Sequence, residues 1–377
     1  MAPAIPVKNV NLDEDELVWQ LNLDQIESNT GKIVDKVKQP LSSAGSSTHF
    51  FNNEHVLYSK LRPYLNKVVV PDELGIATTE LVPMKPDQKR LNKEYLAYYL
   101  RSKPFVEWVS TQVSGAKMPR VVMSIFWQHE MPLPPLYEQE RIVSVLDKSN
   151  RLRQKREQAI KLADDFLRAT FLEMFGDPIE NPKGWNVKPL ADQIVHANNG
   201  ISRRRKEDTN EGDIVLRLQD VHYSGIAFDK ELNRIKLVDK EKQIARVEHD
   251  DLLFIRVNGN PNYVGRTAVF KSYIEPVYHN DHLIRIKLDN EYQSDFLCYL
   301  INSPFSRKLI AQQIKTSAGQ HTISQDGILK LMFYRPPIEL QEKFINIKNK
   351  IESIFYRKDK HEDLFASISN KLIHSIK

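Results

Sequence analysis

Cysteine is almost absent from this sequence of 377 residues, which contains only Cys298. A single cysteine excludes an internal disulfide framework and a cysteine-rich zinc site. Cys298 lies in an apolar run between Leu297 and Tyr299, so we expect a thiol packed in a core. We find no signal peptide and no apolar run long enough to span a bilayer, which predicts a cytoplasmic protein.

The signatures of several enzyme classes are missing as well. Asn260-Pro261-Asn262-Tyr263 is one residue away from the Asn-Pro-Pro-Tyr motif of amino-methyltransferases, but no G-x-G occurs to bind S-adenosylmethionine. Pro71-Asp72 with Asp87-Gln88-Lys89 fits a loose nuclease pattern that charged chains produce easily. His279 and His282 have no apparent third metal ligand, and neither H-E-x-x-H nor G-x-S-x-G occurs. We therefore expect no catalytic residue, no metal site and no cofactor in this chain.

Charge of one sign is not in large excess. The 54 basic residues outnumber the 49 acidic ones only slightly, which gives a net charge of +5. This balance permits a polyanionic partner without requiring one, so the clustering of the basic residues decides the matter. With 41% hydrophobic residues the chain can build ordinary cores, and its length predicts two or three domains.

The chain repeats itself at an offset of about 200 residues. Three segments of the first half recur in the second: residues 133–140 (LPPLYEQE) as 335–342 (RPPIELQE), residues 99–105 as 299–305, and residues 51–60 as 247–256. The offset changes between these pairs, as expected if loops of different length join matched elements. An internal repeat of this kind predicts two copies of one structural unit.

Each Pro-Pro of the repeat is followed by a long helical pattern. Proline is tolerated in the first turn of a helix, and the apolar positions that follow alternate at spacings of three and four, as in a helix–helix seam. Each helix would extend for about 35 residues, or roughly 50 Å. The predicted seam residues are Ile142, Val145, Leu152, Phe166, Phe344, Ile347, Ile351, Ile354, Phe365, Ile368 and Leu372.

The order of blocks and helices predicts an α+β fold with a pseudo-two-fold internal repeat. Two mixed α/β domains, each with short strands rich in β-branched residues, would be separated by two long antiparallel helices of coiled-coil type. Gly176 followed by Pro178 marks the end of the first helix. We place the domains and helices as follows: first domain 1–137, central spacer helix 138–176, second domain 177–338, distal spacer helix 339–377.

Basic and amide side chains gather in turn-like segments of both blocks. Arg and Lys neutralise phosphates, while Arg pairs with guanine and Asn or Gln pairs with adenine in the major groove. A single loop of this composition can be ordinary solvated surface, and its recurrence in both halves is what favours DNA. The candidate DNA-binding residues are Lys60, Arg62, Lys67, Lys117 and Arg120 in the first block and Arg203, Arg204, Arg205, Lys206, Arg256, Asn258, Asn260, Gln320 and His321 in the second.

The repeat and the short motifs at the junctions between its parts resemble those of the specificity subunits of Type I restriction–modification systems. Residues 133–142 (LPPLYEQERI) resemble the family's junction between a recognition domain and a spacer helix. Residues 175–178 (FGDP) with 181–185 (NPKGW) resemble the approach to its second recognition domain. Residues 57–65 resemble one subtype of first recognition domain, and residues 199–221 resemble the start of another. The resemblance extends over nearly the whole chain.

The sequence departs from the family pattern in two places. The second junction has Glu339-Leu340-Gln341 where the first has Tyr137-Glu138-Gln139, and no Pro-Lys-Gly precedes Trp19. The first departure bears on a partner contact, and neither bears on the fold.

This resemblance implies a sequence-specific DNA-binding subunit without catalytic activity. Each target-recognition domain would read one half of a split sequence in double-stranded DNA, and the helices would hold the halves about one helical turn, roughly 34 Å, apart. Two methyltransferase subunits would dock on the helices and methylate adenine with S-adenosylmethionine. Two restriction subunits would use ATP and Mg for translocation and cleavage.

Three other readings stay open. One keeps the fold and changes the partners, as in a methylation-only or Type II-like system. Another is a coiled-coil adaptor that binds proteins but not DNA, which predicts weak and sequence-independent DNA binding. The third is a cryptic nuclease, which predicts metal-dependent cutting that is lost in Asp87→Ala.

Overall fold

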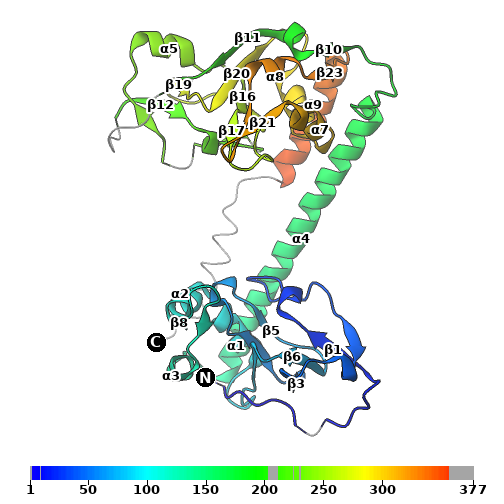
Figure 1. Cartoon of the computed structure of the whole chain (residues 1–377), viewed down its shortest axis with the longest axis vertical. Helices are drawn as coiled ribbons and strands as arrows, with labels where there is room; N and C mark the ends of the chain where they lie inside the picture. The colour runs from blue at the N-terminus through cyan, green and yellow to red at the C-terminus, as the bar shows by residue number, and fades with distance from the viewer. Residues whose placement is uncertain (1, 9, 203–210, 224, 229–230, 356–377) are drawn as a thin grey trace. The chain divides into compact units, whose positions relative to one another are not determined.

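The computed structural model describes residues 2–8, 10–202, 211–223, 225–228 and 231–355 (Figure 1). Over these residues the chain divides into two compact units, one ending at Gln158 and the other beginning at Ala159. The domain boundaries given above stay predictions. Several residues singled out in the sequence lie outside the described ranges: Arg203, Arg204, Arg205, Lys206, Phe365, Ile368 and Leu372.

The first unit contains two small sheets and the two-stranded β8–β9 hairpin, together with short helices. One sheet has the strand order β2-β1-β6-β3, with β1 and β6 parallel, and the other has the order β5-β4-β7 with antiparallel pairs. Trp19 and Phe51 fill one core, while Tyr95, Phe105 and Phe126 fill another. The elements are β1 (Leu17–Leu21), β2 (Lys38–Pro40), β3 (Thr48–Phe51), β4 (Val56–Ser59), β5 (Val68–Val69), β6 (Gly75–Thr78), β7 (Leu81–Met84), α1 (Lys93–Arg101), α2 (Lys103–Thr111), β8 (Val113–Ser114), β9 (Arg120–Val121) and α3 (Met123–Gln128).

The second unit also contains small sheets and short helices, with more strands than the first unit. One sheet has the strand order β15-β12-β19, another β11-β20-β16-β18, and a third β17-β22-β21. Its elements are β10 (Val187–Pro189), β11 (Ile194–Asn199), β12 (Asp213–Leu216), β13 (Val221–His222), β14 (Gly225–Ile226), β15 (Arg234–Ile235), α5 (Asp239–Ala245), β16 (Leu252–Ile255), β17 (Val257–Asn258), β18 (Thr267–Val269), β19 (Val277–His279), β20 (Leu283–Leu288), α6 (Ser294–Asn302), α7 (Pro304–Gln313), β21 (Ile314–Ser317), β22 (Gln320–Ile323), α8 (Gln325–Leu329) and β23 (Met332–Tyr334).

The two units share one topology. The order β5-β4-β7 of the first unit matches β18-β16-β20 of the second, with every pair antiparallel. The order β2-β1-β6 matches β15-β12-β19, and in both the middle strand is antiparallel to the first and parallel to the third. The helices α1, α2 and α3 follow in the same order as α6, α7 and α8. The predicted α+β class and the internal repeat are therefore confirmed.

Each unit contains the start of a helix that begins directly after the Pro-Pro of the repeat. α4 spans Leu136–Phe175 and α9 spans Ile338–Phe355. The carbonyl oxygen of Pro135 accepts from the backbone N–H of Gln139 at 3.1 Å, and that of Pro337 accepts from Gln341 at 3.2 Å. Each proline thus stands directly before the first helical residue, where its missing N–H costs no intrahelical bond. Gly176 ends α4 with a φ of +78°, the left-handed geometry predicted from the sequence.

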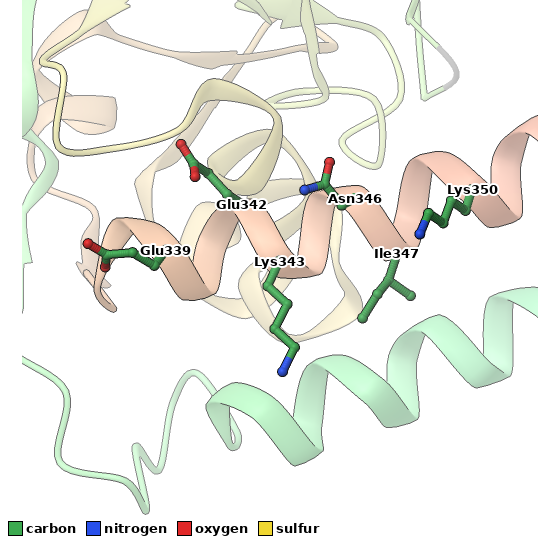
Figure 2. A pocket seen from close by; sticks show the side chains of 6 residues that line it. All are labelled: Glu339, Glu342, Lys343, Asn346, Ile347 and Lys350. Carbon is green, nitrogen blue, oxygen red and sulfur yellow. The ribbon is translucent and has the colours of Figure 1, made fainter.

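The two helices contribute apolar residues to the unit cores. Near its start, α4 buries Ile142 and Leu146 in the first unit. In the second unit, Phe344 of α9 contacts Phe171 and Phe175 of α4, with ring centroids 5.4 and 5.8 Å apart. Because the beginning of α9 meets the end of α4, the two helices run antiparallel there. Figure 2 shows Lys343 and Ile347 of α9 pointing toward α4.

The predicted seam is mixed in its exposure over the described residues. Ile142 and Phe344 are fully buried, and Val145, Ile347 and Ile351 are half-buried. Three other seam positions are largely exposed: Leu152 at 69%, Phe166 at 57% and Ile354 at 68%. Since the remaining seam residues lie outside the described ranges, the continuous seam stays a prediction.

Cys298 packs against the core of the second unit, as expected, and burial raises the pKa of its thiol to about 12. None of the helices in the described ranges combines the length and the apolar character that a membrane span requires.

Candidate nucleic-acid interface

Two segments of the first unit that the sequence nominated separately lie side by side. The chain leaves β4 at Lys60 and pairs with the β8–β9 hairpin, where Leu61 and Arg120 form an antiparallel bridge. The backbone N–H of Val121 donates to the carbonyl oxygen of Lys60 at 2.9 Å, and that of Arg62 donates to Pro119 at 2.8 Å. These bonds bring four of the five predicted residues of this unit to one edge.

The side chains at this edge differ in what they contact. Arg62 and Lys117 are exposed, and Arg62 adopts a left-handed φ of +49°. Arg120 forms an ion pair with Glu80, with Nε 3.0 Å from Oε1. Lys67, the fifth predicted residue, donates from Nζ to the carbonyl oxygen of Leu23 at 2.6 Å, which gives it a structural contact inside the unit.

The second unit builds the same edge from the matching segments. The chain leaves β16 at Arg256 and continues as β17, which pairs with β22 so that Asn258 faces His321. The backbone N–H of Ile323 donates to the carbonyl oxygen of Arg256 at 2.9 Å, as Val121 does to Lys60 in the first unit. Gln320 lies at the tip of the β21–β22 hairpin and is exposed. Asn258, Gln320 and His321 therefore share one small sheet, and Arg256 immediately precedes its strand β17.

The loop after β17 is shaped by its own amides. The side-chain oxygen of Asn258 accepts from the backbone N–H of Asn260 at 2.9 Å, and that of Asn260 accepts from Asn262 at 3.0 Å. These local side-chain hydrogen bonds shape the loop in the absence of helix or strand. Asn260 is exposed, so its amide nitrogen can still reach an external partner. Arg256 donates to the carbonyl oxygen of Asp281 at 3.2 Å.

A cation–aromatic stack lies beside this loop, and it was not predicted from the sequence. The guanidinium of Arg266 lies over the rings of Tyr223 and Tyr263, 3.9 and 4.2 Å from their centroids. Both tyrosines are more than one third exposed. Stacked cation–aromatic groups at a surface suit nucleic-acid contacts. Tyr263 belongs to the Asn260-Pro261-Asn262-Tyr263 segment, but Tyr223 comes from the turn after β13. No sequence pattern connects these two tyrosines.

The residues of the rejected catalytic patterns have structural contacts. The carboxylate of Asp87 accepts from the backbone N–H of Lys89 at 3.1 Å in a turn, and Asp72 forms an ion pair with Lys36 at 2.7 Å. His279 is fully buried and donates from Nδ1 to the carbonyl oxygen of Ala245 at 2.8 Å. Burial lowers the pKa of His279 to about 4. Within the described residues, no three His, Cys, Asp or Glu side chains gather as a metal site.

Figure 2 shows a hollow along α9. All six residues that line it come from this one helix: Glu339, Glu342, Lys343, Asn346, Ile347 and Lys350. A lining from one helix face does not enclose a ligand.

Comparison with known proteins shows which family the chain is similar to. A family model described as the Type I restriction modification DNA specificity domain matches residues 46–162. The specificity subunit of the Type I restriction enzyme StySPI from Salmonella potsdam is 30% identical over 280 residues, which cover 71% of this chain and 59% of that protein. The chain spans about six-tenths of the length of the curated relatives it matches.

Solved structures show the same fold. The crystal structure of the Type I restriction–modification S subunit from M. genitalium aligns with a TM-score of 0.56 at 17% identity and covers 99% of both chains. A chain from a study of complex assembly and conformational transition in a Type I restriction–modification system aligns with a TM-score of 0.54 at 16% identity, over 97% of this chain and 93% of that one. At these identities the likeness supports the fold alone.

Proposed function

The chain belongs to the family of Type I restriction–modification specificity subunits, and on this premise we propose that it reads a split DNA target without catalysing a reaction itself. The observation that carries the proposal is the duplicated edge. In each unit a strand end that carries a basic residue, Lys60 or Arg256, pairs with a hairpin before the Pro-Pro. Two equal readers on one chain suit two half-sites.

The chemistry of the edges suits the reading of duplex DNA. Arg62 and Lys117 in the first unit, and Arg256 in the second, supply cations for phosphates. Asn258 and Gln320 supply amides of the kind that pair with adenine in the major groove, at about 1–3 kcal/mol for each bidentate contact. The segment of Arg203, Arg204, Arg205 and Lys206 adds cations in the second domain by sequence. In this proposal phosphate contacts fix the register, and amide contacts select the bases.

The long helices set the gap between the half-sites. α4 has 40 residues, or about 60 Å, which exceeds the roughly 34 Å of one DNA turn. In the proposed complex, the distal helix pairs with α4 along the predicted seam. Two methyltransferase subunits dock on this pair and carry S-adenosylmethionine, and two restriction subunits carry ATP and Mg. The whole assembly acts in the cytoplasm.

The test is methylome sequencing of the host with and without the gene for this chain. We expect one adenine-methylated motif, made of two short parts separated by a fixed number of unspecified bases, to disappear with the gene. Retained methylation together with lost restriction in a strain without the restriction subunit assigns the two activities to different partners. An unchanged methylome, with the partner subunits present, would contradict the proposal and favour an adaptor that does not read DNA.

A further inference from the structure

Two buried glutamines occupy the same place in the two units. Gln139 lies in the first turn of α4 and Gln341 in the first turn of α9, and both side chains have no exposed surface. Each follows the Pro-Pro by the same number of residues. A buried amide is stable only if its polar atoms find partners, so its hydrogen bonds show what holds it.

In the first unit, Gln139 makes three hydrogen bonds. Its Oε1 accepts from the backbone N–H of Asn92 at 2.8 Å. Its Nε2 donates to the carbonyl oxygens of Arg90 at 2.9 Å and Pro134 at 2.7 Å. Asn92 in turn caps α1 by accepting from the backbone N–H of Tyr95 at 2.9 Å. The glutamine thus joins the first turn of the long helix to the beginning of α1.

In the second unit, Gln341 makes the same three bonds. Its Oε1 accepts from the backbone N–H of Gln293 at 2.9 Å, and its Nε2 donates to the carbonyl oxygens of Glu291 at 3.3 Å and Pro336 at 2.7 Å. Gln293 caps α6 by accepting from Phe296 at 2.9 Å. The capping residue changes from Asn to Gln, whereas the buried glutamine does not.

The partners of these glutamines lead to the proposed reading edges. α1 packs against β4 and β5, and β4 ends at Ser59, just before Lys60, where the first edge begins. α6 packs against β18, which pairs with β16, and β16 ends before Arg256 of the second edge. Only an amide can accept one bond and donate two at this site, because a carboxylate donates none and an aliphatic side chain makes none.

A small change of direction at this joint has a large effect far away. α4 has 40 residues and a length of about 60 Å. A tilt of about 5° at its first turn moves its other end by about 5 Å, which exceeds the rise of roughly 3.4 Å per base pair.

We propose that Gln139 and Gln341 are positioning residues that fix the direction of each long helix against the recognition domain before it, and thereby the gap between the half-sites. The inference rests on the proposed function. It adds that the precision of the gap comes from two side chains and not from helix length alone.

The experiment compares Gln139→Met with Glu140→Met, its exposed neighbour on the same turn. Both variants are assembled with the partner methyltransferase subunits, and competition binding measures the preference for the natural gap over gaps one base pair shorter or longer. In Gln139→Met we expect the ratio of affinities for the natural gap and for the altered gaps to fall about tenfold, because three buried hydrogen bonds are lost. Glu140→Met keeps it. The ratio between gaps does not change when some of the protein is merely unfolded.

A milder pair of variants covers the case in which Gln139→Met fails to assemble. Gln139→Asn and Gln341→Asn keep the amide but shorten it, so each is expected to show an intermediate preference. Wild-type gap preference in assembled Gln139→Asn and Gln341→Asn overturns the positioning role. A wild-type protein without any gap preference overturns the proposed function instead, so the two failures are distinguishable.

Discussion

The two units have the same internal hydrogen bonds at matching positions, but their exposed hairpin turns differ. The bond from Val121 to Lys60 and the bond from Ile323 to Arg256 have the same length, and the two buried glutamines have matching partners. The hairpins differ: β8 and β9 are joined by residues 115–119, whereas β21 and β22 turn tightly at Ala318 and Gly319. The hydrogen bonds that hold each edge to its unit are therefore the same in both units, whereas the hairpin at the edge differs in length.

The cores differ in chemical kind at one matched pair of parallel strands. His279 of β19 pairs with Leu216 in the register where Ala77 of β6 pairs with Leu21. His279 is fully buried, and burial lowers its pKa to about 4 from an ordinary 6.5. In the first unit, burial also lowers the pKa of His49, which is only half-buried. The comparison therefore predicts unequal sensitivity to acid.

The largest expected effect is an acid-induced loss of stability in the second unit. Because the folded pKa of His279 lies below the unfolded value, its contribution is complete above pH 6.5 and is lost as the pH falls toward 4. We expect a loss of about 3 kcal/mol in the free energy of unfolding of this unit. Urea unfolding at pH 7.5 and 4.5, with hydrogen exchange to separate the units, measures it. An equal or greater loss of stability in the first unit would show that His279 does not make the second unit the more acid-sensitive one.

The next effect concerns the hairpin tips. By the offset of 202 residues, Gln320 of the second unit corresponds to Met118 of the first, and both are exposed. Gln320→Ala is expected to lower the affinity for the target roughly tenfold and to relax base preference in one half-site only. Met118→Ala serves as the matched control with little effect. Relaxed preference in both half-sites, seen by selection from random DNA, argues against separate readers.

The smallest effect tests an ion pair that only the first edge contains. Arg120 pairs with Glu80, while the matching residue of the second edge is the uncharged Thr322. Glu80→Gln releases Arg120 and removes a negative charge, so DNA affinity should rise a few-fold at low salt with a slightly steeper salt dependence. Stability should change by less than about 1 kcal/mol, as for other surface pairs. Asp72→Asn, which breaks the pair with Lys36, is the control, and an equal gain there would contradict the assignment.

Sequence reading recovered the features that depend on chain order. The repeat, its offsets, the helix starts at each Pro-Pro and the end of α4 at Gly176 all follow from local patterns. The matching segments before each Pro-Pro also proved to be matching hairpins.

What the sequence could not give depends on contacts between distant segments. Nothing near Lys67 indicates that its ammonium meets the carbonyl of Leu23, 44 residues earlier. Arg120 meets Glu80 across 40 residues for the same reason. The stack of Arg266 with Tyr223 forms only because the turn after β13 folds back beside the loop. The glutamine repeat was visible in the sequence, but its partners were not.

If one reader was duplicated within this chain, the DNA target of a symmetrised chain will reveal it. Residues 178–335 are replaced by a second copy of residues 1–133, and the chimera is expressed with the methyltransferase subunits in the host that lacks the wild-type gene. Methylome sequencing should then reveal an inverted repeat of the first half-site, because two identical readers bound in a symmetric way require equal, inverted half-sites. An asymmetric motif from the folded chimera would contradict the account.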